Sequence, residues 1–271
     1  MEALELAVLV QPEITPLAGG VARTEPGSGA GVEVLIEGVL GHPGPLLSGW
    51  AEGVAARVRD GGPGPAADGS LADLIGHRTV ADVAGLARRV HAELGDDVIE
   101  WAACAGQVWL LQSHRGAAPP EPAPGQQDTT VPPDYVATAG GAGIAALAAL
   151  IWQWGTRVPA RPAAPGAAAG PLLACRPHEP VARDCRDAIL LVDRPLPALA
   201  PLLFGARGVI SRSGAAGSHL AEVARSLGVP MVTGCHLEAV TGPAVAGWVA
   251  AVNGGTGEVA LLSSPTPALR R

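Results

Sequence analysis

The stretch Gly208-Val-Ile-Ser-Arg-Ser-Gly-Ala-Ala-Gly-Ser-His-Leu-Ala-Glu-Val-Ala-Arg-Ser-Leu-Gly-Val-Pro-Met-Val-Thr-Gly234 decides the fold of the second half of this chain. Its pattern predicts a strand, a glycine-rich turn, a short helix that begins at Ser218-His219, a stop at Gly228, and a second strand. Ser218 is a favoured N-cap residue, and a glycine followed by Val-Pro is a strong helix end. This order of elements is typical of an α/β domain.

One histidine is thereby placed in the first turn of a helix. Unpaired backbone N–H groups and the positive end of the helix dipole gather there, and they favour the negative charge of a phosphate group. Gly214 and Gly217 allow the backbone to approach a ligand closely. On local sequence alone, His219 is also consistent with a residue that merely caps or packs the helix. With a ligand, it is well placed to accept and carry a phosphoryl group.

The wider pattern resembles the phosphohistidine swivelling domain of the phosphoenolpyruvate-utilising enzymes. The segment from Ala221 to Gly234 follows the family pattern Ala-x-x-Ala-Arg-x-x-Gly-x-Pro-x-Val-x-Gly, and the resemblance covers about 157–265. It implies a β/β/α domain in which His219 carries the phosphoryl group and Ser218 belongs to the same catalytic turn. Two positions depart from the family: Ser213 replaces the first of two common glycines, and Gly217 stands where many members carry threonine or another residue.

The first half of the chain has a different pattern. It predicts several strands, one amphipathic helix, and a hairpin about Ala105-Gly106. The strands are Leu6–Pro12, Gly19–Pro26, Val32–Gly38 with a short continuation at Leu46–Gly49, Asp97–Ala102 and Gln107–Gln112, and the helix is Thr79–Leu94. This half is therefore expected to be an α+β lobe.

That order of elements resembles the C-terminal part of the ATP-grasp nucleotide-binding domain in the same enzymes. The resemblance implies that Glu100 and Gln112 hold Mg²⁺ and the phosphates of ATP, and that Glu37 is an acidic residue facing the nucleotide. Carboxylate and amide oxygens suit Mg²⁺, which shares its coordination sphere with phosphate. Without the resemblance, Glu37 and Glu100 are interpreted as ordinary exposed residues of strands.

Several positions depart from the ATP-grasp pattern. The family arginine two residues after the glutamine is His114 here, with Arg115 one position later, and the aromatic residue of an earlier strand is Arg23. A neutral imidazole cannot replace the planar guanidinium fork on a phosphate. The chain has no lysine, and all 18 of its basic residues are arginine. We therefore expect a separate chain to supply the early, phosphate-binding lobe.

Composition excludes some classes of function. The net charge of −7 gives no support for nucleic-acid binding. The four cysteines show neither metal-ligand spacing nor a disulfide framework, and Cys235-His236 lacks a second pair of ligands. We expect no secretory signal peptide, because Glu2 and Glu5 interrupt the start, and therefore a cytoplasmic protein.

The uncharged segment Tyr135–Thr156 is the one candidate for membrane association in the sequence. Its apolar core, Ile144–Trp154, is too short to span a bilayer, so we predict a buried or docking helix. The predicted organisation is residues 1–115 as the partial ATP-grasp lobe, 116–156 as a Pro-rich linker and apolar helix, and 157–265 as the swivelling domain. Gly116–Pro133 and Val158–Gly170 are expected to be extended or flexible.

The leading hypothesis from the sequence is a subunit of a split, ATP-dependent phosphotransferase. It would carry a phosphoryl group on His219 from ATP to a small-molecule acceptor that no residue identifies. One alternative is a stand-alone phosphocarrier loaded by another protein. The other is a degenerate, non-catalytic interaction module, which the missing lysine and His114 favour and the intact Ser218-His219 region opposes.

Overall fold

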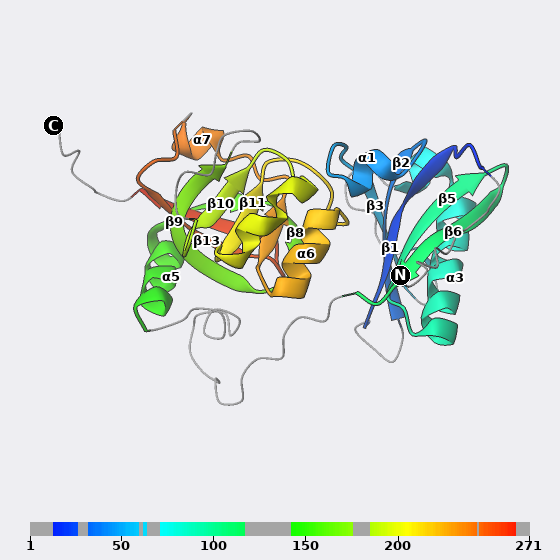
Figure 1. Cartoon of the computed structure of the whole chain (residues 1–271), viewed down its shortest axis with the longest axis horizontal. Coiled ribbons are helices and arrows are strands. Elements are labelled where there is room, and N and C mark those ends of the chain that lie inside the picture. The colour runs from blue at the N-terminus through cyan, green and yellow to red at the C-terminus, as the bar shows by residue number, and fades with distance from the viewer. Residues whose placement is uncertain are drawn as a thin grey trace, which may run out of the picture.

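The computed structural model describes residues 13–26, 32–59, 62–63, 71–116, 142–175, 185–242 and 244–263. These residues form two lobes, each built on its own sheet (Figure 1). We call the described residues up to Gly116 the first lobe and those from Ala142 onward the second lobe. The predicted strand Leu6–Pro12 and most of Gly116–Pro133 lie outside the described residues.

The first lobe is an antiparallel sheet with its two longer helices on one face. Its core includes Ile36, Ile99 and Trp101, whose side chain is fully buried beneath α3. The strand order is β4 (Gly62–Pro63), β3 (Val54–Arg59), β2 (Val32–Leu40), β1 (Ala18–Pro26), β5 (Val98–Cys104) and β6 (Gln107–His114), covered by α2 (Leu71–Ile75) and α3 (His77–Leu94). The predicted helix and hairpin both form.

One element of the first lobe differs from its sequence-based prediction. Leu46–Gly49 was expected to continue a strand, but Gly44–Leu47 is a short helix, α1. Proline explains the difference: Pro45 lies in the first turn of this helix, where a missing N–H costs nothing and the fixed φ suits the helix. A strand at the same place would have lost a ladder hydrogen bond.

The second lobe is a mixed sheet of eight strands. Four central strands are parallel, as β-α-β connections require, and the outer strands pair antiparallel. The order is β7 (Thr156–Pro159), β14 (Glu258–Ser263), β13 (Trp248–Asn253), β9 (Ala167–Cys175), β10 (Ile189–Val192), β11 (Gly208–Ser211), β12 (Met231–Thr233) and β8 (Arg161–Ala164), with 3₁₀-helix η1 (Pro197–Phe204) and helices α6 (His219–Leu227) and α7 (Glu238–Thr241). The protein is thus mixed α/β in its described parts.

The stretch Val158–Gly170 is not the flexible connection that its Pro, Ala and Gly content predicted. It supplies the end of β7, all of β8 and the start of β9. Ala163, Ala164 and Ala168 are buried in this sheet, and β8 pairs with β12 while β9 pairs with β10 and β13. Small apolar side chains that pack between neighbouring strands therefore outweigh the low intrinsic strand preference of alanine.

The apolar helix α5 (Ala142–Trp154) belongs to the second lobe. Ala148 and Ile151 are fully buried against Ala167, Ala251 and Ala260 of strands β9, β13 and β14. This packing agrees with the predicted buried helix, and it shows that the helix packs on the sheet of the second lobe. Among the described residues, no helix combines the length and apolar character needed to cross a membrane.

The two faces of the first sheet have different partners. Alternate residues such as Ala22, Ile36 and Ile99 point to α3, and the residues between them point to the opposite face. Helix α6 of the second lobe lies on that opposite side, so α3 and α6 flank the sheet from either side (Figure 1). The face opposite α3, where Leu47 of α1 packs against Val21 and Val98, is therefore the one that meets the second lobe.

Candidate functional site

Helix α6 begins and ends as the sequence predicts. Ser218 is its N-cap, with an extended backbone, and its Oγ accepts a hydrogen bond of 3.4 Å from the N–H of Ala221. Gly228 ends the helix in the left-handed conformation, with φ of 67°. Ser218 is buried, and its hydroxyl positions the start of the helix.

The turn before α6 explains both departures from the swivelling-domain pattern. Gly214 has φ of 96°, and a Cβ there would lie 2.3 Å from Cδ of Pro195, so glycine is required. The hydroxyl of Ser213 instead donates a hydrogen bond of 2.7 Å to the carbonyl of Asp193, which holds the turn against the end of β10. Gly217 faces the first lobe, as described below.

His219 is the first residue of α6 and is exposed. No side-chain hydrogen bond or ion pair to its imidazole exists within the described part of the chain. The ring is therefore free to act as a nucleophile, beside the unpaired N–H groups of a helix start. The two predicted catalytic residues thus differ in their surroundings: Ser218 is the buried N-cap of α6, and His219 is exposed.

The three residues predicted to face the nucleotide lie in one row across the first sheet. Glu37 of β2 pairs with Val21 of β1, Val21 pairs with Glu100 of β5, and Glu100 pairs with Gln112 of β6. Directly paired residues of an antiparallel sheet share a face, so these side chains project on the side of the second lobe. We call Glu37, Val21, Glu100 and Gln112 the polar row.

Glu100 and Gln112 fit a Mg²⁺–phosphate site. They are a directly opposed pair that offers one carboxylate and one amide oxygen, and neither side chain is engaged by other described residues. No group of three His, Cys, Asp or Glu side chains able to hold a metal occurs in the described residues. Two protein oxygens suit Mg²⁺, which usually keeps water and phosphate oxygens as its remaining ligands.

Glu37 instead contacts the second lobe directly. Its Oε2 accepts a hydrogen bond of 2.9 Å from the N–H of Gly217. Burial between the lobes raises the pKa of the Glu37 carboxyl above 4.5, and hydrogen bonds from Gly217 and Ala216 together with the charges of Arg161 and Arg225 oppose that rise. The carboxylate thus occupies part of the anion-favouring region beside His219.

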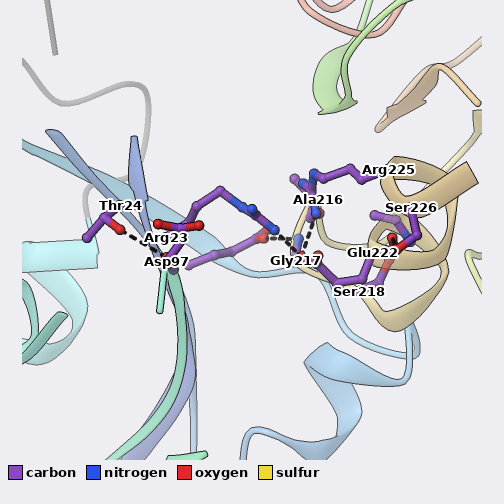
Figure 2. Close-up of polar contacts among 11 residues, drawn as sticks. Arg23, Thr24, Asp97, Ala216, Gly217, Ser218, Glu222, Arg225 and Ser226 are labelled. Atoms are coloured by element: carbon purple, nitrogen blue, oxygen red, sulfur yellow. Dashed lines mark hydrogen bonds and ion pairs between the residues drawn. The ribbon is translucent and has the colours of Figure 1, made fainter. Parts of the chain in front are cut away.

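Arg23 joins the two lobes from the row next to the polar row. Its guanidinium forms an ion pair with Glu222 of α6, and Glu222 also binds Arg225, at 2.6 Å (Figure 2). Arg225 in turn donates a hydrogen bond of 2.9 Å to the carbonyl of Ala216, in the turn before His219. Burial and the nearby Arg23 lower the pKa of Arg225 to about 10, so Arg225 stays protonated at neutral pH.

The position of Arg23 bears on the arginine that the ATP-grasp pattern lacks. Arg23 pairs with Val98 and Val98 with His114, so His114 lies on the same face, with a buried Nδ1 that has no partner among the described residues. Arg115 extends over Gly95 at the end of α3, which places it on the other face. Of these three residues, Arg23 is the one that brings a guanidinium to the face of the polar row.

Sequence reasoning missed the contribution of Glu222, Arg225 and Arg161 to this site. Arg225 carried a signal, because it is the arginine of the Ala-Arg pair in the swivelling-domain pattern. Cys235, considered and set aside as a metal ligand, is buried, and burial together with the charge of Glu238 raises the pKa of its thiol to about 12. It is a protonated core residue at neutral pH.

Comparison with known proteins points to the second lobe. The sequence family described as PEP-utilising enzyme, mobile domain, matches residues 185–257, which contain the turn, His219 and the whole of α6. This match supports a phosphohistidine-carrying phosphotransfer domain. No curated protein matches the chain.

Three solved structures show partial similarity. A UPF0107 protein studied in solution is 14% identical, over 40% of this chain and 99% of that chain, with a TM-score of 0.33. Aconitase X of Thermococcus kodakaraensis is 17% identical, over 40% and 99%, with a TM-score of 0.31. The N-terminal domain of Enzyme 1 – Nitrogen is 33% identical, over 32% and 35%, with a TM-score of 0.25. All three TM-scores are below 0.5.

Proposed function

We propose that this chain carries a phosphoryl group on His219, as one subunit of a split ATP-dependent phosphotransferase. The observation that carries the proposal is the docking of the His219 turn on the face of the first sheet that bears the polar row. A nucleophilic imidazole and a pair of Mg²⁺-compatible oxygens then belong to the same region of the molecule. A further chain would supply the early ATP-grasp lobe and its phosphate-binding cations.

The proposed chemistry uses His219 twice. First, the lone pair of a ring nitrogen forms a bond to phosphorus while the bond from phosphorus to the nucleotide oxygen breaks, and that oxygen keeps the electron pair. Second, an oxygen of the small-molecule acceptor attacks the same phosphorus and the N–P bond breaks, which regenerates the imidazole. The start of α6 favours the added negative charge in the interval.

The residues of the first lobe would orient and neutralise rather than react. Glu100 and Gln112 would hold Mg²⁺, which supplies charge neutralisation on the phosphate oxygens of ATP when bound. Arg23 offers a guanidinium on the same face, although in the docked arrangement it is paired with Glu222. Phosphoryl transfer depends mainly on such positioning and charge stabilisation.

A second candidate function is a phosphocarrier loaded by another protein. The location of the family match favours it, because residues 185–257 lie wholly within the second lobe. In that case the first lobe would dock the carrier without binding a nucleotide, and His114 in place of the family arginine would be unimportant.

Labelling of the full chain tests both functions. The chain is incubated with Mg²⁺ and either β- or γ-labelled ATP or labelled phosphoenolpyruvate, with and without the product of a neighbouring gene for an ATP-grasp lobe. We expect acid-labile label on His219 in the presence of the partner. The exposed His236 is a matched control, since His236→Ala should label normally and His219→Ala should not. Equal labelling of His219→Ala and the parent chain would exclude both functions.

A further inference from the structure

We infer that Gly217 and Val21 form a size-matched contact that permits the His219 turn to dock on the first sheet, and that Arg23 positions α6 in this docked state. The inference concerns docking alone and does not require His219 to carry a phosphoryl group. It rests on three features of the contact between the lobes: the missing side chain at Gly217, the carboxylate of Glu37, and the ion pair between Arg23 and Glu222.

The steric evidence is direct. A Cβ added to Gly217 would lie 2.2 Å from Cγ1 of Val21, and 3.4 Å from Oε2 of Glu37. The three atoms nearest to that Cβ all belong to Val21 and Glu37, in the first lobe. A separation of 2.2 Å between carbons is far inside van der Waals contact, so any side chain at this position would push the turn off the sheet.

The second lobe by itself does not require glycine at this position. Gly217 is not among the glycines with positive φ, in contrast to Gly214 in the same turn. An alanine at 217 is therefore compatible with the backbone of the turn, and no atom of the second lobe stands closer than 3.4 Å to its methyl group. The first lobe, and not the backbone of the turn, therefore requires glycine at position 217.

Polar contacts fix the orientation of α6 relative to the first sheet when the His219 turn is docked. Glu37 accepts a hydrogen bond from the N–H of Gly217, and Arg23 forms an ion pair with Glu222 in the first turn of α6. The side chains of Arg23 and Glu222 are only 15% and 19% exposed, so removing either one leaves a charge largely shielded from water. Because Arg225 links Glu222 to the carbonyl of Ala216, the ion pair holds the turn and the helix as one unit (Figure 2).

A second set of contacts between the lobes supports the same arrangement. Arg194 donates a hydrogen bond of 2.5 Å to the carbonyl of Trp50 and stacks over its ring, and Arg161 pairs with Glu52 at 3.4 Å. These side chains are more exposed than Arg23 and Glu222, so they contribute less to docking. The size match at Gly217 and the ion pair of Arg23 are therefore the determinants to test.

Fluorescence energy transfer within the full chain measures docking directly. A donor and an acceptor are attached through unnatural amino acids at Ala92 of α3 and Leu150 of α5, both exposed and remote from the contact. Gly217→Ala is expected to lower the ratio of docked to undocked molecules about tenfold or more. Val21→Ala removes Cγ1, so the double variant Val21→Ala with Gly217→Ala should dock as the parent chain does.

Matched controls separate docking from folding. Gly85 in α3 has open space around an added Cβ, so Gly85→Ala should leave the energy transfer unchanged. Arg23→Ala should reduce docking, whereas Arg57→Ala, which removes a 46% exposed partner of Glu33, should not. Circular dichroism should show an intact fold for Gly217→Ala.

Three results would overturn the inference. These are unchanged energy transfer in Gly217→Ala, no recovery in the double variant, and loss of the fold of the second lobe in Gly217→Ala. None of these measurements uses nucleotide or label on His219, so the inference can fail while the proposed phosphotransfer stands, and the reverse also holds.

Discussion

Glu37 and Gly217 lie 180 positions apart in the chain, yet the N–H of Gly217 donates a 2.9 Å hydrogen bond to Oε2 of Glu37. This contact brings the turn that carries His219 to the polar row of the first sheet. It also places a carboxylate where backbone N–H groups favour negative charge. This contact thus joins a main-chain group of the second lobe to a side chain of the first lobe.

The buried carboxyl of Glu37 should make docking stronger in mild acid. Docking raises its pKa above the ordinary 4.5, so the docked state binds the proton more tightly than the undocked state. The resulting stabilisation is fully present below pH 4.5 and is lost as pH rises through the raised value. We expect the docked fraction of the parent chain to fall across this window, as measured by energy transfer between the lobes.

Glu37→Gln is the control for that pH dependence. The amide oxygen accepts a hydrogen bond from the same N–H, but the amide does not titrate in this pH range. This component of the pH dependence should therefore vanish. Arg161 and Arg225, the cations that act on Glu37, stay charged throughout the window, so they do not mimic the effect. An identical pH profile in the two proteins would contradict the assignment to Glu37.

Ser218→Ala should destabilise the second lobe by about 1 kcal/mol, the usual cost of losing an N-cap. The hydroxyl accepts the N–H of Ala221, and that N–H has no intrahelical partner without it. Unfolding in urea measures the loss. Ser226→Ala, on the exposed side of the same helix, should change stability by no more than about 0.5 kcal/mol. Similar losses for both variants would argue against a specific cap.

Glu100→Ala should reduce Mg²⁺-dependent labelling of His219 from ATP by about tenfold or more, because a carboxylate that holds the metal is lost. The initial rate of label incorporation in the presence of the partner chain is the measurement. Glu93→Gln, an exposed carboxylate on α3, is the matched control and should label at the parent rate. If labelling in Glu100→Ala is undiminished, the phosphocarrier alternative is preferred.

The cysteines should divide into two reactivity classes. Cys175 and Cys235 are buried, and burial raises the pKa of both thiols, that of Cys235 to about 12. Iodoacetamide at mildly alkaline pH should therefore modify Cys104 and Cys185, which are partly exposed, well before the other two. Mass spectrometry of peptides follows the order, and urea should abolish it. Early modification of Cys235 in the folded chain would refute its place in the core.

Local patterns predicted the start of α6 and the hairpin that pairs Glu100 with Gln112. Ser218 caps the start of a nine-residue helix and Gly228 ends it, and neither capping interaction depends on distant contacts. Glu100 and Gln112 become partners because the turn at Ala105-Gly106 fixes the register of a hairpin. Both predictions needed only short-range information.

The contact between the lobes could not be predicted in the same way. No periodicity links Arg23 to Glu222, or Val21 to Gly217, because their pairing depends on how two separate sheets meet. The absence of a side chain at Gly217 was visible as a departure from a family pattern, but its cause lies in another lobe. The strands within Val158–Gly170 were missed for a related reason, since their neighbours in the sheet come from distant segments.

The packing of α5 on the second sheet has a consequence for the energetics of docking. Because both lobes belong to one chain, the His219 turn meets the first sheet intramolecularly, at an effective concentration that two separate proteins rarely reach. A contact of weak intrinsic affinity is then enough to keep a substantial fraction of the molecules docked. Weak, readily reversed docking is therefore sufficient for this protein, and small changes such as one methyl group at Gly217 can shift the balance.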